Sequence, residues 1–187
     1  TWHFPCMNEY RDKILRMVRT PSAVWNVGAL AVESIKYTPI MSRRDVLESL
    51  DLQNAERLAV STYHPVTLET EMGRRGLEAM LEALDREEDL VVLFTASNSD
   101  QGGAGLNRRM QEFVDDNVPR FSFTPFLGQK LYINFMRHAD FMIGNSSSAF
   151  FQAAILGLPA INVGGRQQGR YRPDNVIDCG HYTEDIS

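Results

Sequence analysis

Apolar runs and helix-like patterns alternate along most of the chain, and this alternation predicts its fold. Leu77, Met80, Leu81 and Leu84 recur every three or four residues and predict an amphipathic helix over residues 73–86. The run from Leu90 to Thr95 is almost wholly apolar, which is typical of a parallel strand covered on both faces. Including that run, short strands are predicted at residues 23–27, 57–63, 90–95, 121–123, 140–143, 160–163 and 176–178.

Further helices are predicted between these strands. Ser42 is expected to cap a helix over 43–50, with Asp45 at its third position. The segment 148–156 is apolar except at Gln152, as buried helices are. Other helical patterns lie within residues 1–20, around Leu106, Met110, Phe113 and Val114, and over 129–139.

Strands that alternate with helices predict an α/β fold, here a Rossmann-like three-layer domain with a mainly parallel sheet. We assign residues 1–20 to a connector helix and residues 21–187 to this domain. Ligands of such sheets collect beyond the carboxyl ends of the strands. We therefore expect the ligand-binding residues in the loops after Tyr63, Thr95, Phe123, Ile143 and Val163.

The most informative segment runs from Asp140 to Ser148. A short buried strand is followed by Gly144 and Asn145, which allow a sharp turn, and then by three serines that open a helix. The start of a helix has unpaired N–H groups and a partial positive charge, so small hydroxyl residues there can admit an anion. The sequence predicts a phosphate or carboxylate cradle at Ser146, Ser147 and Ser148; the alternative is that a serine only caps the helix.

A second candidate is the loop Gly164–Arg170, which follows the last core strand. Arg166 and Arg170 lie among glycines that let the backbone approach a ligand closely, and Arg172 adds a third positive charge. A solvated basic loop is the alternative. The position of the loop, next to the serine turn, favours an anion site.

Three weaker candidates lie in the neighbouring loops and helix. His64 follows a strand directly, and could donate to a phosphate oxygen, act as an acid or base, or simply bond a loop carbonyl. Asn98 belongs to a polar loop that a turn alone would explain. Gln152 is expected one helical turn after Ser148, where it could reach a ligand or satisfy a core group.

Composition narrows the choice of partners. The 187 residues are 43% apolar and 23% charged, as in ordinary globular proteins, and the net charge of -5 argues against nucleic acid. Cys6 and Cys179 lie far apart in the sequence, which fits a reducing compartment. They do not have the close spacing of zinc ligands. No segment resembles a signal peptide or a membrane span of roughly 18 apolar residues. We expect a cytoplasmic protein with no membrane partner, no metal and no cofactor, and leave a homo-oligomer open.

Six blocks of this sequence, in this order, resemble the UDP-N-acetylglucosamine 2-epimerase family, in particular its hydrolysing, sialic-acid-pathway branch. The blocks are Val27–Leu30, Tyr63–Glu69, Asn98–Gly103, Leu127–Gln129 with Tyr132, His138–Ser148 and Gly165–Arg170. The resemblance implies the C-terminal, nucleotide-binding half of a GT-B-like enzyme, whose active site lies between two Rossmann-like halves. His64-Pro65, in place of the His-Arg-Arg-Glu-Asn pattern of the non-hydrolysing branch, favours the hydrolysing one.

The resemblance also implies roles for individual residues. His64 and Ser146 would contact the diphosphate, Tyr132 would lie near the uracil, and the loop of Arg166 and Arg170 would border the site. The residues expected to bind UDP are His64, Asn98, Tyr132, Ser146, Ser147, Ser148, Gln152, Arg166 and Arg170. His64 is the catalytic candidate, but the family's proposed catalytic carboxylates lie in the N-terminal half. We therefore expect this chain alone to bind UDP without turnover.

The family reaction eliminates UDP across the sugar C1–C2 bond and then adds water, so that the hydrolysing branch releases UDP and N-acetylmannosamine. This chain departs from the family at Gln152, where a glutamate usually holds the ribose hydroxyls, and at Ala149, where glycine is favoured. These departures leave open another substrate, such as a UDP-diacetamido sugar, or a nucleotide-sugar-binding module without catalysis. The donor half of a GT-B glycosyltransferase ranks last.

Overall fold

A computed structural model describes residues 1–52, 55–66 and 70–186 and divides the chain into two units. The first unit is Thr1–Thr38 and the second is Pro39–Ser187. This division falls later in the chain than the boundary expected after residue 20. The role of residues 1–20 as a connector from another domain stays a prediction.

The first unit contains two extended segments joined by a helix. Its helices are α1 (Asn8–Met17), the short 3-10 helix η1 (Pro21–Ala23) and α2 (Leu30–Tyr37). His3 and Val24 pair in parallel, with Trp25 N–H donating to the His3 carbonyl at 3.0 Å. The strand predicted at 23–27 is therefore wrong as a strand of the main sheet, because its backbone groups bond to residues 3–5 instead. The fixed φ of Pro21 also favours the helical turn at its start.

The second unit is built on a six-stranded parallel sheet in the order β3-β2-β1-β4-β5-β6. Its strands are β1 (Arg57–Thr62), β2 (Leu90–Thr95), β3 (Phe121–Thr124), β4 (Phe141–Gly144), β5 (Ala160–Val163) and β6 (Val176–Cys179). The Rossmann-like α/β fold is confirmed. The chain winds outward in one direction from β1 and in the other from β4, so the topological switch point lies between these two strands.

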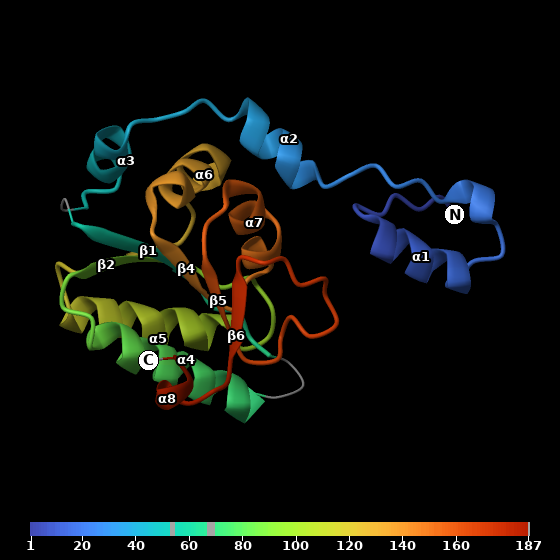
Figure 1. Cartoon of the computed structure of the whole chain (residues 1–187). Helices are drawn as coiled ribbons and strands as arrows, with labels where there is room; N and C mark the ends of the chain where they lie inside the picture. The colour runs from blue at the N-terminus through green and yellow to red at the C-terminus, as the bar shows by residue number, and fades with distance from the viewer. Residues whose placement is uncertain (53–54, 67–69, 187) are drawn as a thin grey trace. The chain divides into compact units, whose positions relative to one another are not determined.

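Helices cover both faces of this sheet (Figure 1). The helices α3 (Arg43–Ser49), α6 (Gly128–His138) and α7 (Gln152–Leu156) lie on one face. The helices α4 (Thr70–Asp85), α5 (Gly103–Asp116) and α8 (Thr183–Ile186) lie on the other. The predicted cap of α3 is confirmed, since Ser42 Oγ accepts from the N–H of Asp45 at 3.1 Å. The single turn α8 and the helix α2 are not predicted by the sequence pattern.

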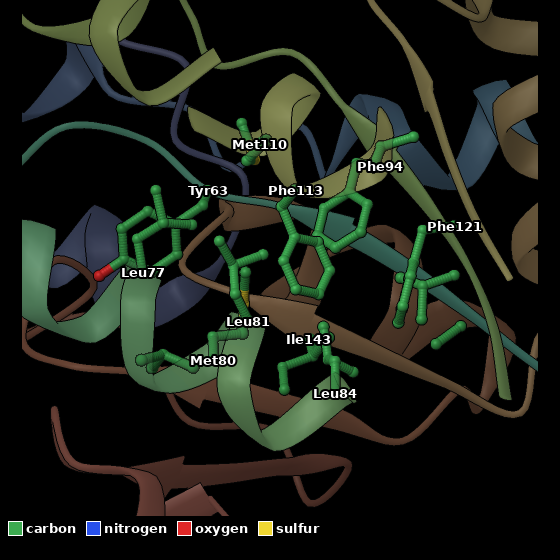
Figure 2. Packing of buried hydrophobic residues seen from close by; sticks show 14 of the residues in the cluster. Tyr63, Leu77, Met80, Leu81, Leu84, Phe94, Met110, Phe113, Phe121 and Ile143 are labelled. Atoms are coloured by element: carbon green, nitrogen blue, oxygen red, sulfur yellow. The ribbon is translucent and has the colours of Figure 1, made fainter. Parts of the chain in front are cut away.

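Two apolar clusters, one on each face, hold the sheet between its helices. On the α4 and α5 face, Phe113 packs against Phe121 with ring centroids 4.9 Å apart, and both rings contact Phe94 (Figure 2). Alternate residues of β2 enter opposite clusters, Phe94 on this face and Leu93 on the other. Every residue of β2 is buried, as its continuous apolar run predicts.

The helix predicted over 148–156 is not continuous. The chain forms the 3-10 helix η2 (Ser147–Phe150) and then α7, and Phe151 interrupts them with φ −122° and ψ −76°. Ala149 and Phe150 are buried in the apolar cluster on this face, so packing decides the path of this segment over helix propensity. No helix among the described residues has the length and apolarity needed to cross a lipid bilayer.

Candidate functional site

The switch point of the sheet brings the loops after β1 and β4 together. Thr62 and Gly144, the last residues of these strands, pair in register. Gly144 adopts a φ of +136°, and a Cβ atom there would collide with the carbonyl oxygen of Thr62. Glycine is therefore required at the turn, and the two strands end close enough for their loops to interact.

Asn145 connects the His64 loop to the serine turn. Its side chain is 0% exposed, and its Oδ1 accepts from the N–H of His64 at 2.7 Å. Its Nδ2 donates to the carbonyl of His64 at 2.9 Å. From the sequence, Asn145 is predicted only as a turn residue. It could have been identified because its amide side chain can both donate and accept, and because it follows a buried strand beside the switch point.

The basic loop after β5 contacts the same residue, Asn145. Arg166 Nη1 donates to the Asn145 carbonyl at 3.2 Å, and Gln167 Nε2 donates to it at 2.7 Å. Gln167 is 1% exposed, which makes it a buried support of the loop. Arg170 is exposed, and its positive charge lowers the pKa of Arg166. The loops after β1, β4 and β5 therefore converge on Asn145.

Arg172 supports this loop through three contacts within the chain. Its Nε donates to Asp178 Oδ2 at 2.8 Å, its Nη1 donates to the Gln167 carbonyl at 2.9 Å, and its guanidinium stacks on Phe150 at 4.7 Å. Arg172, the third positive charge of this segment, therefore has a structural role.

The serine turn combines a cap with partly exposed polar groups. Ser146 is buried, and its Oγ accepts from the N–H of Ser148 at 3.3 Å, so the capping alternative is confirmed for this oxygen. Its hydroxyl hydrogen remains able to donate. Ser147 and Ser148 are half-buried. Because η2 has only four residues, its dipole adds little, and local N–H and O–H groups are the donors that this turn offers.

Two aromatic residues belong to elements at this edge of the sheet, Tyr132 in α6 and Phe126 in the loop after β3. The Tyr132 hydroxyl is hydrogen-bonded with Ser148 and Thr62; burial raises its pKa while these two bonds lower it. Phe126, in the loop after β3, is 86% exposed. Sequence reasoning selects the loop after Phe123 but not this ring. An exposed aromatic side chain at the carboxyl edge of a sheet can stack on a planar ligand.

His64 is held as a neutral hydrogen-bond donor. Its Nδ1 accepts from the N–H of Asn98 at 3.0 Å, which leaves the proton on Nε2. Burial and, to a smaller extent, the positive charge of Arg166 lower the pKa of His64 from 6.5 to about 4, and Asp100 partly offsets these two effects. The imidazole is thus neutral at pH 7, which favours donation to an anion over general-acid chemistry.

The electrostatics of Arg166 also favour an anion. Burial lowers the pKa of this guanidinium, Asp100 opposes the change, and Arg170 adds repulsion. A negatively charged ligand near Arg166 and Arg170 would relieve that repulsion. Asp100 in turn accepts from Asn98 Nδ2 at 2.5 Å, so one carboxylate partly balances the loop.

One candidate is displaced from its expected position. Phe151 separates η2 from α7, so Gln152 does not follow Ser148 by one α-helical turn. Gln152 is the first residue of α7 and is half-buried. Among the other candidates, His64, Ser146 and Arg166 lie around Asn145, and Asn98 joins them through its hydrogen bond to His64.

Comparisons with known proteins show which family this chain resembles. The family model described as UDP-N-acetylglucosamine 2-epimerase matches residues 1–187. A GDP/UDP-N,N'-diacetylbacillosamine 2-epimerase (hydrolyzing) from Campylobacter jejuni is 31% identical over 176 residues, which are 94% of this chain and 46% of that protein. A UDP-N,N'-diacetylbacillosamine 2-epimerase (hydrolyzing) from Legionella pneumophila is 28% identical over 177 residues, 95% of this chain and 46% of that protein.

Solved structures match the fold over nearly all of the chain. The UDP-GlcNAc 2-epimerase from Neisseria meningitidis bound to UDP-GlcNAc superposes with a TM-score of 0.73 at 14% identity, covering 99% of this chain and 51% of that one. The Methanocaldococcus jannaschii enzyme in complex with UDP-GlcNAc and UDP gives 0.69 at 15% identity, covering 98% and 51%. The chain spans about half the length of these relatives. By its match to the family model over its whole length, it belongs to the UDP-N-acetylglucosamine 2-epimerase family.

Proposed function

We propose that the loops around Asn145 bind the pyrophosphate of a UDP-sugar. The observation that carries this proposal is the convergence of three loops on one buried residue, which holds the His64 imidazole and the Arg166 guanidinium at the same sheet edge. The neutral imidazole offers an Nε2–H donor, Arg166 and Arg170 offer charge, and the serine turn offers hydroxyl and amide donors. Together they suit a polyanion with several oxygens.

The rest of the nucleotide would lie along the same edge. Phe126, exposed at the end of β3, is suited to stack on the base, and Tyr132 lies beside the serine turn. Gln152 at the start of α7 would accept a hydrogen bond from the ribose. It lacks the charge of the glutamate that the family uses, so we expect weaker ribose binding.

For the whole protein we propose a hydrolysing UDP-sugar 2-epimerase, of which this chain is the C-terminal half. Loss of UDP from C1 with removal of the C2 proton leaves negative charge on the departing diphosphate. His64, Arg166 and Arg170 would stabilise that charge. The acid and base carboxylates would come from the other half. The free cysteines Cys6 and Cys179 suit the reducing cytoplasm in which we place the protein.

Two substrates are supported by different observations. UDP-GlcNAc is supported by the family model and by the solved neighbours. A UDP-diacetamido sugar is supported by the names of the Campylobacter and Legionella relatives, and by Gln152, which departs from the pattern of the family. The first would place the enzyme in sialic-acid synthesis, and the second in the supply of a diacetamido sugar.

The test is release of UDP by the whole protein from each substrate. We expect UDP and the free C2-inverted sugar from one of them, and binding without release from this chain alone. Tight binding of both UDP-sugars by the whole protein with no release of UDP would contradict the enzyme assignment and support a binding module. His64→Ala in the whole protein should lower the rate of UDP release.

A further inference from the structure

A cavity of about 370 Å³ lies between α4 and α5, separate from the residues that surround Asn145. The two helices run side by side on one face of the sheet (Figure 1). The volume lies within the range of about 300–1,000 Å³ that small-molecule sites occupy. Its lining comes from α4, from α5 and from the loops that contain Pro65 and Gly102.

The walls of the cavity combine an apolar base with a charged rim. Leu77 and Leu106 supply buried apolar surface. On the rim, Arg109 donates to both carboxylate oxygens of Glu78, each at 2.8 Å, so these two charges balance. Arg74, the third charged residue of the described lining, has a long, exposed contact of 3.6 Å to Glu71, which lies outside that lining. The described lining residues therefore carry one positive charge in excess, which favours a ligand with one negative charge.

The first turn of α5 opens onto this space. A Cβ atom added to Gly105 would meet no atom within 4 Å, so the cavity reaches the helix backbone. The amino end of this 14-residue helix adds partial positive charge to the same wall. The apolar base, the excess positive charge and the helix terminus all favour a ligand that has an apolar body and a negative charge.

The cavity lies behind the two loops that hold the His64 imidazole. Pro65 directly follows His64, and a Cβ atom on Gly102 would lie 3.8 Å from the Pro65 Cβ. Gly102 closes the loop that begins with Asn98, whose N–H donates to His64 Nδ1 at 3.0 Å. A molecule bound against Pro65 and Gly102 would therefore contact both loops whose residues, His64 and Asn98, form this hydrogen bond.

We propose that this cavity is a second small-molecule site, which binds a monoanionic compound with an apolar body. Its lining includes residues of the loops after β1 and β2, which also carry His64 and Asn98. The proposal does not depend on the identity of the nucleotide, because the residues that line the cavity are not those assigned to UDP.

Binding is tested with 8-anilinonaphthalene-1-sulfonate, an aromatic monoanion whose fluorescence rises in apolar surroundings. Gly105→Phe fills the cavity, and Gly105→Ala is the matched control because it changes the same backbone position without filling it. We expect at least tenfold weaker probe binding in Gly105→Phe and unchanged binding in Gly105→Ala. Equal binding by Gly105→Phe, confirmed as folded by circular dichroism, would overturn the proposal, since the probe would then sit elsewhere.

The charge and the link to His64 have their own readouts. N-phenyl-1-naphthylamine, which is uncharged, should bind at least fivefold more weakly than the sulfonate, and Arg74→Gln should reduce that difference. Equal affinity for the two probes would overturn the monoanion assignment. Saturation with the sulfonate should also shift the His64 Cε1–H proton resonance, and an unmoved resonance would overturn the connection between the two sites.

Discussion

The Asn145 side chain forms two hydrogen bonds with the backbone of His64, one accepted from its N–H at 2.7 Å and one donated to its carbonyl at 2.9 Å. This pair closes a ring between the loops after β1 and β4, two strands that are adjacent in the sheet but far apart in the chain. The Asn145 carbonyl accepts from Arg166 and Gln167 at the same time. One buried amide residue thus fixes the relative positions of the imidazole, the serine turn and the basic loop.

Replacing Asn145 should lower both stability and affinity for UDP. Asn145→Leu leaves a backbone N–H and a carbonyl of His64 without partners, and we expect the free energy of unfolding to fall by about 2–5 kcal/mol. Urea denaturation measures this loss. Asn117→Ala is the control, because it removes one bond, to the Phe113 carbonyl at a helix end. Equal losses of unfolding free energy in the two variants would contradict this prediction, because the Asn145 bonds would then stabilise the protein no more than the single Asn117 bond does.

The pKa of His64 should respond to its charged neighbours. Arg166 lowers this pKa, so Arg166→Ala should raise it from about 4 toward 6.5; Asp100 raises it, so Asp100→Asn should lower it. UDP, as an anion, should raise it. Proton NMR of the imidazole across pH 3–8 measures all three changes. A His64 pKa that is unmoved by Arg166→Ala would contradict the placement of this guanidinium.

The lowered pKa of His64 also predicts how stability depends on pH. The unfolded imidazole takes up a proton near pH 6.5, whereas the folded one stays neutral until about pH 4. The proton therefore favours the unfolded state between these values, and stability should fall as the pH drops from 6.5 toward 4. His64→Gln, which cannot titrate, should show a smaller fall, as measured by urea denaturation at a series of pH values.

The arginines of the basic loop should separate into ligand-facing and structural residues. Arg170→Ala should weaken UDP by about 5- to 30-fold, the loss expected for a charge-assisted contact of roughly 1–2 kcal/mol, and leave uridine unchanged. Arg172→Ala should instead lower stability, because this side chain contacts Asp178, the Gln167 carbonyl and Phe150. Arg108→Ala, at an exposed position of α5, is the control for loss of net charge. An equal loss of UDP affinity in all three variants would indicate that only the net charge of the protein matters and would contradict a specific contact of Arg170.

Two glycines should respond to alanine in opposite directions. Gly144→Ala places a Cβ atom against the Thr62 carbonyl at a φ of +136°, so the variant should lose stability and UDP binding together. Gly105→Ala lies in α5 with open space around it and should stabilise the protein by about 0.5–1 kcal/mol through helix propensity. Thermal unfolding compares the two. A neutral Gly144→Ala variant would contradict the close approach of β1 and β4.

Much of the fold follows from local sequence patterns. β2 and β5 have the predicted bounds, and the helix of Leu77, Met80, Leu81 and Leu84 forms as expected. In these segments the local pattern and the observed burial agree. The pattern at 23–27 is strand-like, but it cannot show which partner the segment pairs with, and pairing with His3 is a tertiary choice. The break at Phe151 likewise depends on how Ala149 and Phe150 pack.

The candidate site follows from sheet topology more than from any single motif. His64, Ser146 and Arg166 are predicted from the ends of strands, and the switch point between β1 and β4 explains why they meet. Asn145 and Gln167 are not predicted as site residues, because their role depends on burial and on partners that lie in other loops. The pKa of His64 also depends on long-range contacts, so the sequence alone left its charge open.

Calorimetric titration of this chain with UDP and with uridine tests the convergence on pyrophosphate most directly. We expect UDP to bind with a dissociation constant between about 1 μM and 1 mM, and at least tenfold more tightly than uridine. His64→Ala and Arg166→Ala should each narrow that difference while preserving the affinity for uridine. UDP that binds no more tightly than uridine to the folded wild-type chain would contradict the account.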